Sequence, residues 1–340
     1  MQPKYPNNPT IKDVAKRANV SIATVSRVLN NLSGYSDKTK HKVNHVIQEM
    51  GYQPNAIARG LINKRTQTIG VLFPSVSSYF SSEILHGIEE YANDNNYSVF
   101  VCNTDEDGKR TMKYLQVLRE KQVDGIVFSS EKLKKEYYDV MQAMEIPVVL
   151  VSTKADYASV PYVKVDDQQA AYDAVEYLID NGHREIAMIG GSKKDEVAGT
   201  PRIKGYQKAL EHNGIPFREH YLAYGNFNFH GGCVAMESLL QTAPEATAIF
   251  VASDEMAIGV LTVAAKHGLK VPEDLSIIGY DNLKLAEMVV PPLTTMNQPL
   301  YEMGKSAAEK LIYMINSGHV ADSTIVPHRV VERQTVRRLT

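Results

Sequence analysis

The sequence predicts two parts of different fold class: an N-terminal all-α headpiece with a helix-turn-helix, and an α/β core of two doubly wound parallel-sheet subdomains. The length of 340 residues is enough for about two domains. The apolar pattern is helical up to Gly51 and changes after Thr68 to strands that alternate with helices. Charge changes in the same region: residues 1–65 hold 11 basic and 3 acidic side chains, a net charge of +8, whereas the remaining 26 basic and 36 acidic side chains give −10.

Composition excludes several classes of protein. Apolar residues make up 44% of the chain and charged residues 22%, so the chain can bury a sizeable core. The only cysteines are Cys102 and Cys233, which rules out a disulfide-stapled scaffold and indicates a reducing compartment. Residues 1–9 lack an apolar run that could act as a secretory signal, and no apolar stretch is long enough to span a bilayer. We therefore expect a cytoplasmic protein that does not act at a membrane.

Two short helices with a turn between them are predicted at the start of the basic segment. The first follows Thr10, which with Asp13 resembles a capping box in which Asp replaces the usual Glu or Gln. Its apolar stripe comprises Ile11, Val14, Ala15 and Ala18. After a break at residues 19–21, Ser21 caps a second helix that runs through Asn30. The inward side chains of the second helix are Val25, Val28 and Leu29. This is a helix-turn-helix arrangement.

A third helix is predicted between Ser36 and Gly51, and its inward stripe comprises Val43, Val46, Ile47 and Met50. A bundle with a purely structural role is the plain alternative for three short helices. Phosphate binding, however, needs an excess of cations with short polar donors beside them. The segment has cations at Lys12, Lys16, Arg17, Arg27, Lys38, Lys40 and Lys42, and donors at Thr24, Ser26, Asn30 and Thr39. We therefore expect double-stranded DNA as its partner.

Two stretches of this segment resemble a known family. Residues 10–15 read Thr-Ile-Lys-Asp-Val-Ala, and residues 20–30 read Val-Ser-Ile-Ala-Thr-Val-Ser-Arg-Val-Leu-Asn. They closely resemble the headpiece of the lactose-repressor (LacI/GalR) family of bacterial transcription regulators, and residues 51–61 resemble the hinge helix of that family. The resemblance implies a helix-turn-helix DNA-binding headpiece over residues 1–52 and a hinge helix and linker over residues 53–66.

The resemblance assigns base reading in the major groove to Ile22, Ala23 and Arg27. Arg27 can pair with guanine through two hydrogen bonds, and Ala23 is small enough to accept a thymine methyl group. Ile22 is also spaced to join the inward stripe of its helix, so burial is an alternative for it. Contacts to DNA phosphates are implied for Ser21, Thr24, Ser26, Asn30, Thr39 and Tyr52.

The hinge helix is expected to fold only with DNA and a second copy of the chain present, because little more than one turn of helix is not stable alone. The resemblance implies minor-groove contacts for Asn55, Ala58 and Leu61. Leu61 corresponds to a leucine that wedges between base steps and bends the duplex, an action open to apolar side chains. The alternative is a leucine that only covers the core domain. A Leu61→Ala variant with full operator affinity and unchanged bending would refute the wedge.

After Thr68 the pattern predicts apolar strands alternating with amphipathic helices. Buried strands are predicted at residues 69–73, 98–102, 125–128 and 147–151, and again at 186–189, 248–252 and 275–280. Helices are predicted between them at residues 83–96, 109–121, 173–181, 202–213, 231–240 and 255–266. Two such units in tandem place a ligand site at the carboxyl ends of their strands, in a cleft between the units.

This order of elements resembles the periplasmic-binding-protein-like sensor core of the same family, so the resemblance extends to about Arg338. It implies an effector-binding and dimerisation core over residues 67–340. The chain would cross between the subdomains near residues 160–163, 291–293 and 325–327. The N-subdomain would then comprise residues 67–161 and 293–325, and the C-subdomain residues 162–292 and 326–340.

The resemblance also implies an effector site in this core. Asp281 is expected to accept hydrogen bonds from ligand hydroxyl groups and Arg202 to donate them, with a structural Arg–Asp ion pair as the alternative. Apolar faces against a sugar ring are expected from Tyr79, Phe80 and Phe227, with burial in the core as their alternative. Ser253 stands where the lactose repressor has an asparagine, which leaves the choice of ligand open.

No catalytic site, metal site or cofactor is expected. The chain lacks the glycine-rich nucleotide-binding patterns, the G-x-S-x-G nucleophile motif and the H-E-x-x-H zinc motif, and its ten histidines show no metal-ligand spacing with the cysteines. We therefore expect that the chain is not an enzyme. A sugar-binding transport protein would share the core, but it would need an export signal and would not need the basic headpiece.

The sequence thus predicts a homodimeric, sequence-specific transcription regulator, a repressor of carbohydrate-utilisation genes. Its affinity for a pseudo-palindromic operator would change when a small sugar or sugar phosphate binds the core. Lys193 and Lys194 could contact a phosphorylated ligand, although charged loops are usually only solvated. The alternative within the family is a global carbon-catabolite regulator whose co-effector is a phosphorylated carrier protein. Val290, at a position where such a regulator has arginine, cannot pair with a phosphoserine.

Overall fold

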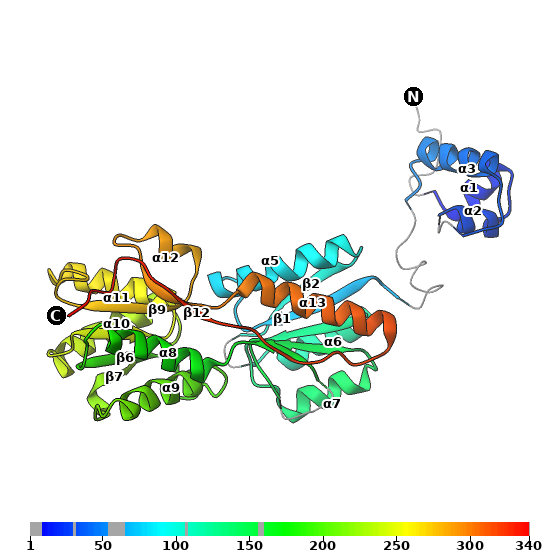
Figure 1. Cartoon of the computed structure of the whole chain (residues 1–340). Helices are drawn as coiled ribbons and strands as arrows, with labels where there is room; N and C mark the ends of the chain where they lie inside the picture. Colours follow the sequence, from blue (N-terminus) through cyan, green and yellow to red (C-terminus); the bar gives the residue numbers. More distant parts are fainter. Residues whose placement is uncertain (1–8, 30–31, 54–64, 106–107, 156–159, 340) are drawn as a thin grey trace. The chain divides into compact units, whose positions relative to one another are not determined.

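The computed structural model describes residues 9–29, 32–53, 65–105, 108–155 and 160–339. The chain divides into two compact units, Met1–Thr66 and Gln67–Thr340. In the described ranges the first unit is all-α, and the second is an α/β core with two sheets (Figure 1). Within the described ranges, no helix has both the length and the apolar character needed to cross a membrane.

The headpiece unit contains the three predicted helices, α1 (Ile11–Ala18), α2 (Ile22–Leu29) and α3 (Asp37–Met50). Thr10 and Asp13 form the predicted capping box: the Thr10 amide donates to Asp13 Oδ2 at 2.9 Å, and the Asp13 amide donates to Thr10 Oγ1 at 3.4 Å. Val14, Val25 and Val43 have no exposed surface and form one apolar core between the helices. The predicted helix-turn-helix is confirmed.

The ends of α3 also lie where the sequence predicts them. Ser36 Oγ accepts a hydrogen bond from the Thr39 amide at 3.3 Å, which caps the first turn. Gly51 ends the helix with φ +62, a left-handed conformation that glycine adopts without a steric penalty.

The first half of the core is a six-stranded sheet in the order β11-β5-β4-β3-β1-β2, with all neighbouring strands parallel. Its strands are β1 (Thr68–Phe73), β2 (Ser98–Asn103), β3 (Gly125–Ser129), β4 (Val148–Val151), β5 (Tyr162–Lys164) and β11 (Thr324–Ile325). Its helices are α5 (Tyr79–Asp94), α6 (Thr111–Glu120), α7 (Lys135–Ala143) and α13 (Leu300–Ser317). Val71 and Leu72, neighbours on β1, belong to different apolar clusters, so both faces of the sheet are covered.

The second half of the core is a six-stranded sheet in the order β12-β10-β9-β8-β6-β7, parallel except for β12, which runs antiparallel to β10. Its strands are β6 (Ile186–Gly190), β7 (Leu222–Tyr224), β8 (Ala248–Val251), β9 (Ser276–Asp281), β10 (Thr294–Asn297) and β12 (Arg329–Val331). Its helices are α8 (Asp167–Asp180), α9 (Gly199–His212), α10 (Phe229–Thr242), α11 (Asp254–Lys266) and α12 (Lys284–Met288). The predicted fold class, two doubly wound units in tandem, is confirmed.

Two predicted crossings between the subdomains are displaced along the chain. The first is predicted near residues 160–163, but β5 pairs with β4 and stays in the first sheet, so the chain crosses after Lys164. The second is predicted near residues 291–293, but β10 pairs with β9 in the second sheet, so the chain crosses after Asn297. The third crossing lies between β11 and β12. The structure therefore moves the boundaries 161/162 and 292/293 to 164/165 and 297/298, because strand pairing decides which subdomain a short segment joins.

The structure also corrects the burial of one strand. The segment at residues 98–102 is predicted as a buried strand, but β2 forms an edge of the first sheet. Val101 on this strand is 39% exposed. An edge strand is covered less completely than its neighbours, and its apolar side chains alone do not reveal this from sequence.

Helices α5 and α13 pack closely against each other on the first sheet (Figure 1). Two glycines allow this approach. A Cβ atom at Gly87 would lie 2.0 Å from the Tyr301 carbonyl oxygen, and one at Gly304 would lie 2.0 Å from the Ile84 carbonyl oxygen. Both positions therefore require the absence of a side chain.

Candidate functional site

The start of α2 presents the predicted base-reading residues to solvent. Ile22 is 45% exposed, and Ala23 and Arg27 are exposed as well, while Val25 and Val28 fill the core side of the same helix. The alternative that Ile22 is buried is therefore wrong. The exposed face of α2 carries an apolar, a small and a cationic side chain, which together can contact thymine methyl groups and guanine.

Arg27 lies against a glycine in the turn after α2. Gly34 has φ +106, a conformation that other residues rarely adopt, and a Cβ atom there would lie 2.7 Å from Arg27 Nη1. Gly34 thus permits the tight backbone turn and also leaves the space in which the Arg27 side chain lies.

Three of the predicted phosphate contacts, Ser21, Thr24 and Thr39, lie at the N-terminal ends of α2 and α3. Ser21 Oγ accepts from the Thr24 amide at 3.0 Å and lies 2.9 Å from Thr24 Oγ1, so Ser21 caps α2. Thr39 Oγ1 makes the same hydroxyl contact with the capping serine of α3, at 3.0 Å. Ser26 is half-buried on α2, and Tyr52 packs against the headpiece core after α3. Helix N-termini attract phosphate groups through their amide groups and dipole.

Four predicted DNA contacts lie outside the described residues: Asn30, Asn55, Ala58 and Leu61. The last three belong to the predicted hinge helix. Their roles stay predictions that rest on the family resemblance.

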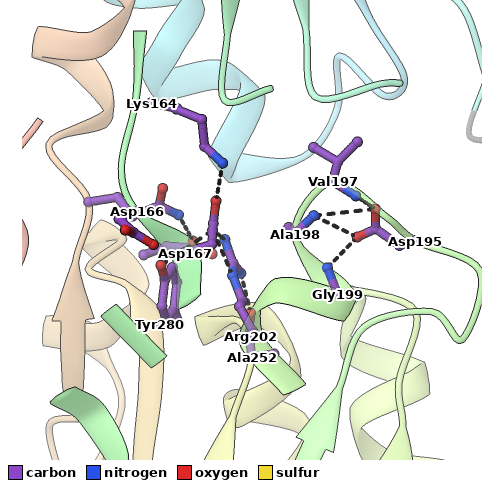
Figure 2. A network of polar contacts seen from close by, with 12 residues as sticks. Lys164, Asp166, Asp167, Asp195, Val197, Ala198, Gly199, Arg202, Ala252 and Tyr280 are labelled. Carbon is purple, nitrogen blue, oxygen red and sulfur yellow. Dashed lines mark hydrogen bonds and ion pairs between the residues drawn. The ribbon is translucent and has the colours of Figure 1, made fainter. Parts of the chain in front are cut away.

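Arg202, on α9, lies at the centre of the predicted effector site and is 4% exposed. Its Nε and Nη2 both donate to Asp167 Oδ1, at 3.1 and 2.9 Å, and its Nη1 donates to the Ala252 carbonyl at 2.6 Å (Figure 2). Its Cζ lies 3.7 Å from the centroid of the Tyr280 ring. The protein thus already uses three of the five N–H groups of the guanidinium.

Asp167 is a functional candidate that the sequence analysis missed. It begins α8, directly after the first crossing, and its Oδ2 lies 3.0 Å from Lys164 Nζ. Asp167 is therefore paired with two buried cations, Lys164 and Arg202 (Figure 2). We call Lys164, Asp167, Arg202 and Tyr280 the Arg202 cluster. The sequence did contain a signal, a pair of aspartates where a strand leads into a helix: Asp166 caps α8, which leaves Asp167 for another role.

Phe227 and Ser253 lie next to Arg202. The Phe227 ring centroid is 5.7 Å from Arg202 Cζ, and the ring occupies the space that a Cβ atom at Gly191 would take. Ser253 follows Ala252, whose carbonyl accepts from Arg202, and the Ser253 hydroxyl accepts from an amide in the first turn of α11 at 3.3 Å. This hydroxyl caps the helix as an acceptor and can still donate its own proton to a ligand.

Asp281 ends β9 in an unusual backbone conformation. It has φ +115, and Asn282 after it has φ +59; such values are rare for residues other than glycine and are often found at ligand sites. Asp281 Oδ1 accepts from Gln298 Nε2, at the second crossing, at 2.7 Å. Burial raises the pKa of Asp281 well above its ordinary value; Arg202 opposes this shift and the Asp254 carboxylate adds to it.

Tyr79 and Phe80 begin α5, in the half of the core that is built on the first sheet. Tyr79 is 52% exposed, whereas Phe80 is half-buried against an apolar cluster that also includes Leu283 and Leu300. Leu283 follows the end of β9, so this cluster contains side chains from both halves of the core. Burial in the core, the alternative for both residues, therefore fits Phe80 better than Tyr79.

The structure therefore groups four of the six predicted effector residues in the C-subdomain: Arg202, Phe227, Ser253 and Asp281. The other two, Tyr79 and Phe80, belong to the N-subdomain. Arg202 does form an ion pair with an aspartate, as the alternative proposed, but its partner is not Asp281. The carboxylate that hydrogen-bonds to Arg202 is Asp167, on the neighbouring helix α8, whereas Asp281 acts on Arg202 through its field.

Sequence comparisons match both units of the chain to one family. Residues 10–55 match a family described as "Bacterial regulatory proteins, lacI family", and residues 66–334 match "Periplasmic binding proteins and sugar binding domain of LacI family". The chain belongs to the LacI family of bacterial regulatory proteins. It is a DNA-binding transcription regulator with an effector-binding core, as the resemblance implied.

Named relatives agree over nearly the whole chain. The chain is 41% identical over 332 residues to catabolite control protein A of Priestia megaterium, which covers 97% of this chain and 100% of the relative. It is 36% identical over 317 residues to the ribose operon repressor of Haemophilus influenzae, with 93% and 95% covered. A structure of the lac repressor dimer bound to operator and the anti-inducer ONPF is similar with a TM-score of 0.87 and 27% identity, covering 97% of this chain and 100% of that chain. The transcriptional regulator CelR in complex with cellobiose is similar with a TM-score of 0.74 and 30% identity, covering 96% and 100%.

Proposed function

We propose that the chain is a homodimeric repressor of carbohydrate-utilisation genes, whose affinity for a pseudo-palindromic operator changes when a small sugar or sugar phosphate binds the core. The observation that carries this proposal is the presence of two sites in one chain: an exposed reading face on α2, and a polar group around Arg202 and Asp281 at the strand ends of the core. Solved relatives support both halves, since one is a dimer on operator DNA and another holds cellobiose.

At the operator, Ile22, Ala23 and Arg27 read bases in the major groove, and the helix-start hydroxyl groups hold phosphates. Asn55, Ala58 and Leu61 contact the minor groove, where Leu61 wedges between base steps. A two-fold symmetric dimer places two such headpieces on adjacent half-sites. The action is binding rather than catalysis, and it takes place in the cytoplasm, where the operator is.

In the core, Asp281 accepts from ligand hydroxyl groups, and Arg202 and Ser253 donate to ligand oxygens. Ligand binding can alter the operator affinity only if the ligand binds two conformations of the core unequally. The contacts of this site connect it to both crossings between the subdomains. Asp281 is hydrogen-bonded to Gln298 at the second crossing, and Asp167 is paired with both Arg202 and Lys164 at the first crossing. A ligand that engages Arg202 and Asp281 therefore acts on residues at the joints between the subdomains.

The test uses the full-length chain. A panel of sugars and sugar phosphates is screened by thermal shift, and each compound that stabilises the core is added to an equilibrium binding assay with an operator selected from random DNA. An Asp281→Asn variant should lose the response to the ligand, whereas Asp322→Asn, at an exposed position of the core, should keep it. If no compound both stabilises the core and changes operator affinity, the sensor proposal is wrong.

A second candidate is a global carbon-catabolite regulator whose co-effector is a serine-phosphorylated carrier protein. The identity of 41% to catabolite control protein A over almost the whole chain favours it. The residues before the paired prolines argue against it, because Met288 and Val290 are apolar and are 68% and 92% exposed. Such side chains cannot pair with a phosphoserine. Tight binding of the phosphorylated carrier, with all sugars inert, would make this second candidate the better one.

A further inference from the structure

The charges of the Arg202 cluster determine which ligands the proposed effector site can accept. Two cations in this cluster, Lys164 and Arg202, share one carboxylate, Asp167. All three residues are less than a tenth exposed: Lys164 is 7% exposed, Asp167 5% and Arg202 4%. Water and salt therefore screen their interactions little. Asp167 cancels much of the positive charge that an anionic ligand would otherwise meet.

Two further carboxyl groups reduce the positive charge of the site. Asp254 and Asp281 are buried, and the field of Asp281 acts directly on Arg202. With both groups ionised, these two carboxyl groups and the three charged residues of the Arg202 cluster carry a net charge of −1; with both protonated, they carry +1. A phosphate monoester carries a charge of about −1.5 to −2 at neutral pH. In neither state does the site provide enough positive charge to balance it.

Hydrogen-bonding capacity leads to the same conclusion. The bonds from Arg202 to Asp167 and to the Ala252 carbonyl leave two N–H groups of the guanidinium for a ligand (Figure 2). Asp281, when ionised, can only accept hydrogen bonds, so its ligand must supply a donor. A sugar hydroxyl group both accepts from Arg202 and donates to Asp281. A phosphate dianion lacks the donor, so the phosphate group of a sugar phosphate cannot take the place of a hydroxyl group at an ionised Asp281.

The loop after β6 does not change this balance. Lys193 and Lys194 in this loop are exposed, but the same loop carries Asp195 and Glu196. The Asp195 carboxylate accepts from amides of the loop and of the first residue of α9 (Figure 2), and Glu196 pairs with Lys132 of the N-subdomain. The four charges of the loop cancel, so the two exposed lysines do not form a phosphate-binding site.

We propose that the effector is an uncharged sugar, bound through its hydroxyl groups by Arg202 and Asp281, and that Asp167 is the residue that excludes phosphorylated sugars. This inference rests on the proposed function of the core as a carbohydrate sensor. Asp167 acts through Arg202 and Lys164, as a specificity-determining residue that does not itself contact the ligand.

The unmodified full-length chain provides the first test. Ribose, glucose and galactose are compared by isothermal titration with ribose 5-phosphate, glucose 6-phosphate and galactose 6-phosphate, and cellobiose is added as an uncharged disaccharide. At least one uncharged sugar should bind, and a phosphorylated partner should bind at least about tenfold more weakly. A phosphate ester that binds as tightly as its parent sugar overturns the inference and leaves the proposed function intact. If neither class binds, the proposed function itself is contradicted.

Asp167→Asn provides the second test. Asparagine has nearly the same size and can still accept from Arg202, but it removes one negative charge from the cluster. The preference for the uncharged sugar over its phosphate should then fall by about tenfold. Asp173→Asn makes the same change of charge further along α8 and should leave the preference within about twofold of the unmodified chain. An unchanged preference in Asp167→Asn refutes the role of Asp167. The comparison in the unmodified chain decides the ligand class even where the variant does not fold.

Discussion

Asp254 is a carboxyl group without exposed surface at the start of α11. Its Oδ2 accepts from the Leu283 amide at 2.7 Å, and its Oδ1 accepts from the Thr295 hydroxyl at 2.6 Å. Burial raises the pKa of Asp254 from 3.8 to about 7, although these two hydrogen bonds oppose the shift. Between these two values the folded chain binds a proton at Asp254 and the unfolded chain does not.

The free energy of unfolding should therefore depend on pH through Asp254. A pKa that is raised in the folded state contributes stability that is fully present below the unfolded value and is lost as pH rises through about 7. In Asp254→Asn this dependence should disappear, because the amide can accept from Leu283 and donate to Thr295 without ionising. Urea unfolding of both proteins at several values between about pH 5 and pH 8 measures the difference. Parallel pH profiles for the two proteins would show that Asp254 is ionised throughout.

Arg27 is the residue whose replacement should change which sequence is bound. Arg27→Ala should weaken operator binding by about 10- to 100-fold and relax the preference at one base pair, because a bidentate contact to guanine is lost. Lys42→Ala, at an exposed position of α3, should weaken binding to all sequences alike. Fluorescence anisotropy with the operator and its single-base variants distinguishes the two effects. A uniform loss in Arg27→Ala would show that Arg27 contacts the DNA backbone instead.

At the scale of elements, the glycine contact between α5 and α13 fixes how this helix pair covers the first sheet. Gly87→Ala should lower the free energy of unfolding by about 3 kcal/mol, because the added Cβ would lie 2.0 Å from the Tyr301 carbonyl oxygen, and backbone cannot shift cheaply. Glu89→Ala, exposed on the same helix, should change it by less than about 0.5 kcal/mol. Urea unfolding measures both values. Equal stability of Gly87→Ala and the unmodified chain would mean that the two helices can move apart freely.

The elements that the sequence predicts are those with long apolar patterns. The three headpiece helices and the central strands of both sheets are confirmed, because caps and buried runs mark them locally. The short strands β5, β10 and β12 could not be predicted, since their three or four residues, unlike those of β4 and β8, do not form a continuous apolar run, and their sheet is decided by pairing. The helix predicted from residue 173 begins earlier, at Asp167, because Asp166 caps its first turn.

Two charged residues of the site could be predicted from the sequence, and a third could not. Arg202 and Asp281 were predicted through the family resemblance. Asp167 was missed because it lay in the predicted gap between a strand and a helix, and its role depends on contacts with residues at two other places in the chain, Lys164 and Arg202. Long-range pairing of charges leaves no periodic signal in a sequence.

At the scale of the whole molecule, a net charge of −2 hides two units of opposite charge. Positive charge is concentrated in residues 1–65, so DNA contact should release counterions there while the acidic core is repelled. Operator affinity should fall by about a thousandfold or more between about 50 and 200 mM salt. Equilibrium binding across a salt series gives the slope. A nearly salt-independent affinity would contradict the assignment of phosphate contacts to the headpiece.

We expect that one ligand, bound at the Arg202–Asp281 site, controls the affinity of the headpiece for DNA. The most direct measurement is the operator Kd of the full-length chain with and without the sugar that stabilises the core most. A change of about 5- to 150-fold is predicted, in either direction, together with a change of equal factor in sugar affinity when the operator is saturating. A sugar that raises the Tm of the core but leaves the operator Kd within about twofold would show that the ligand site does not control DNA binding.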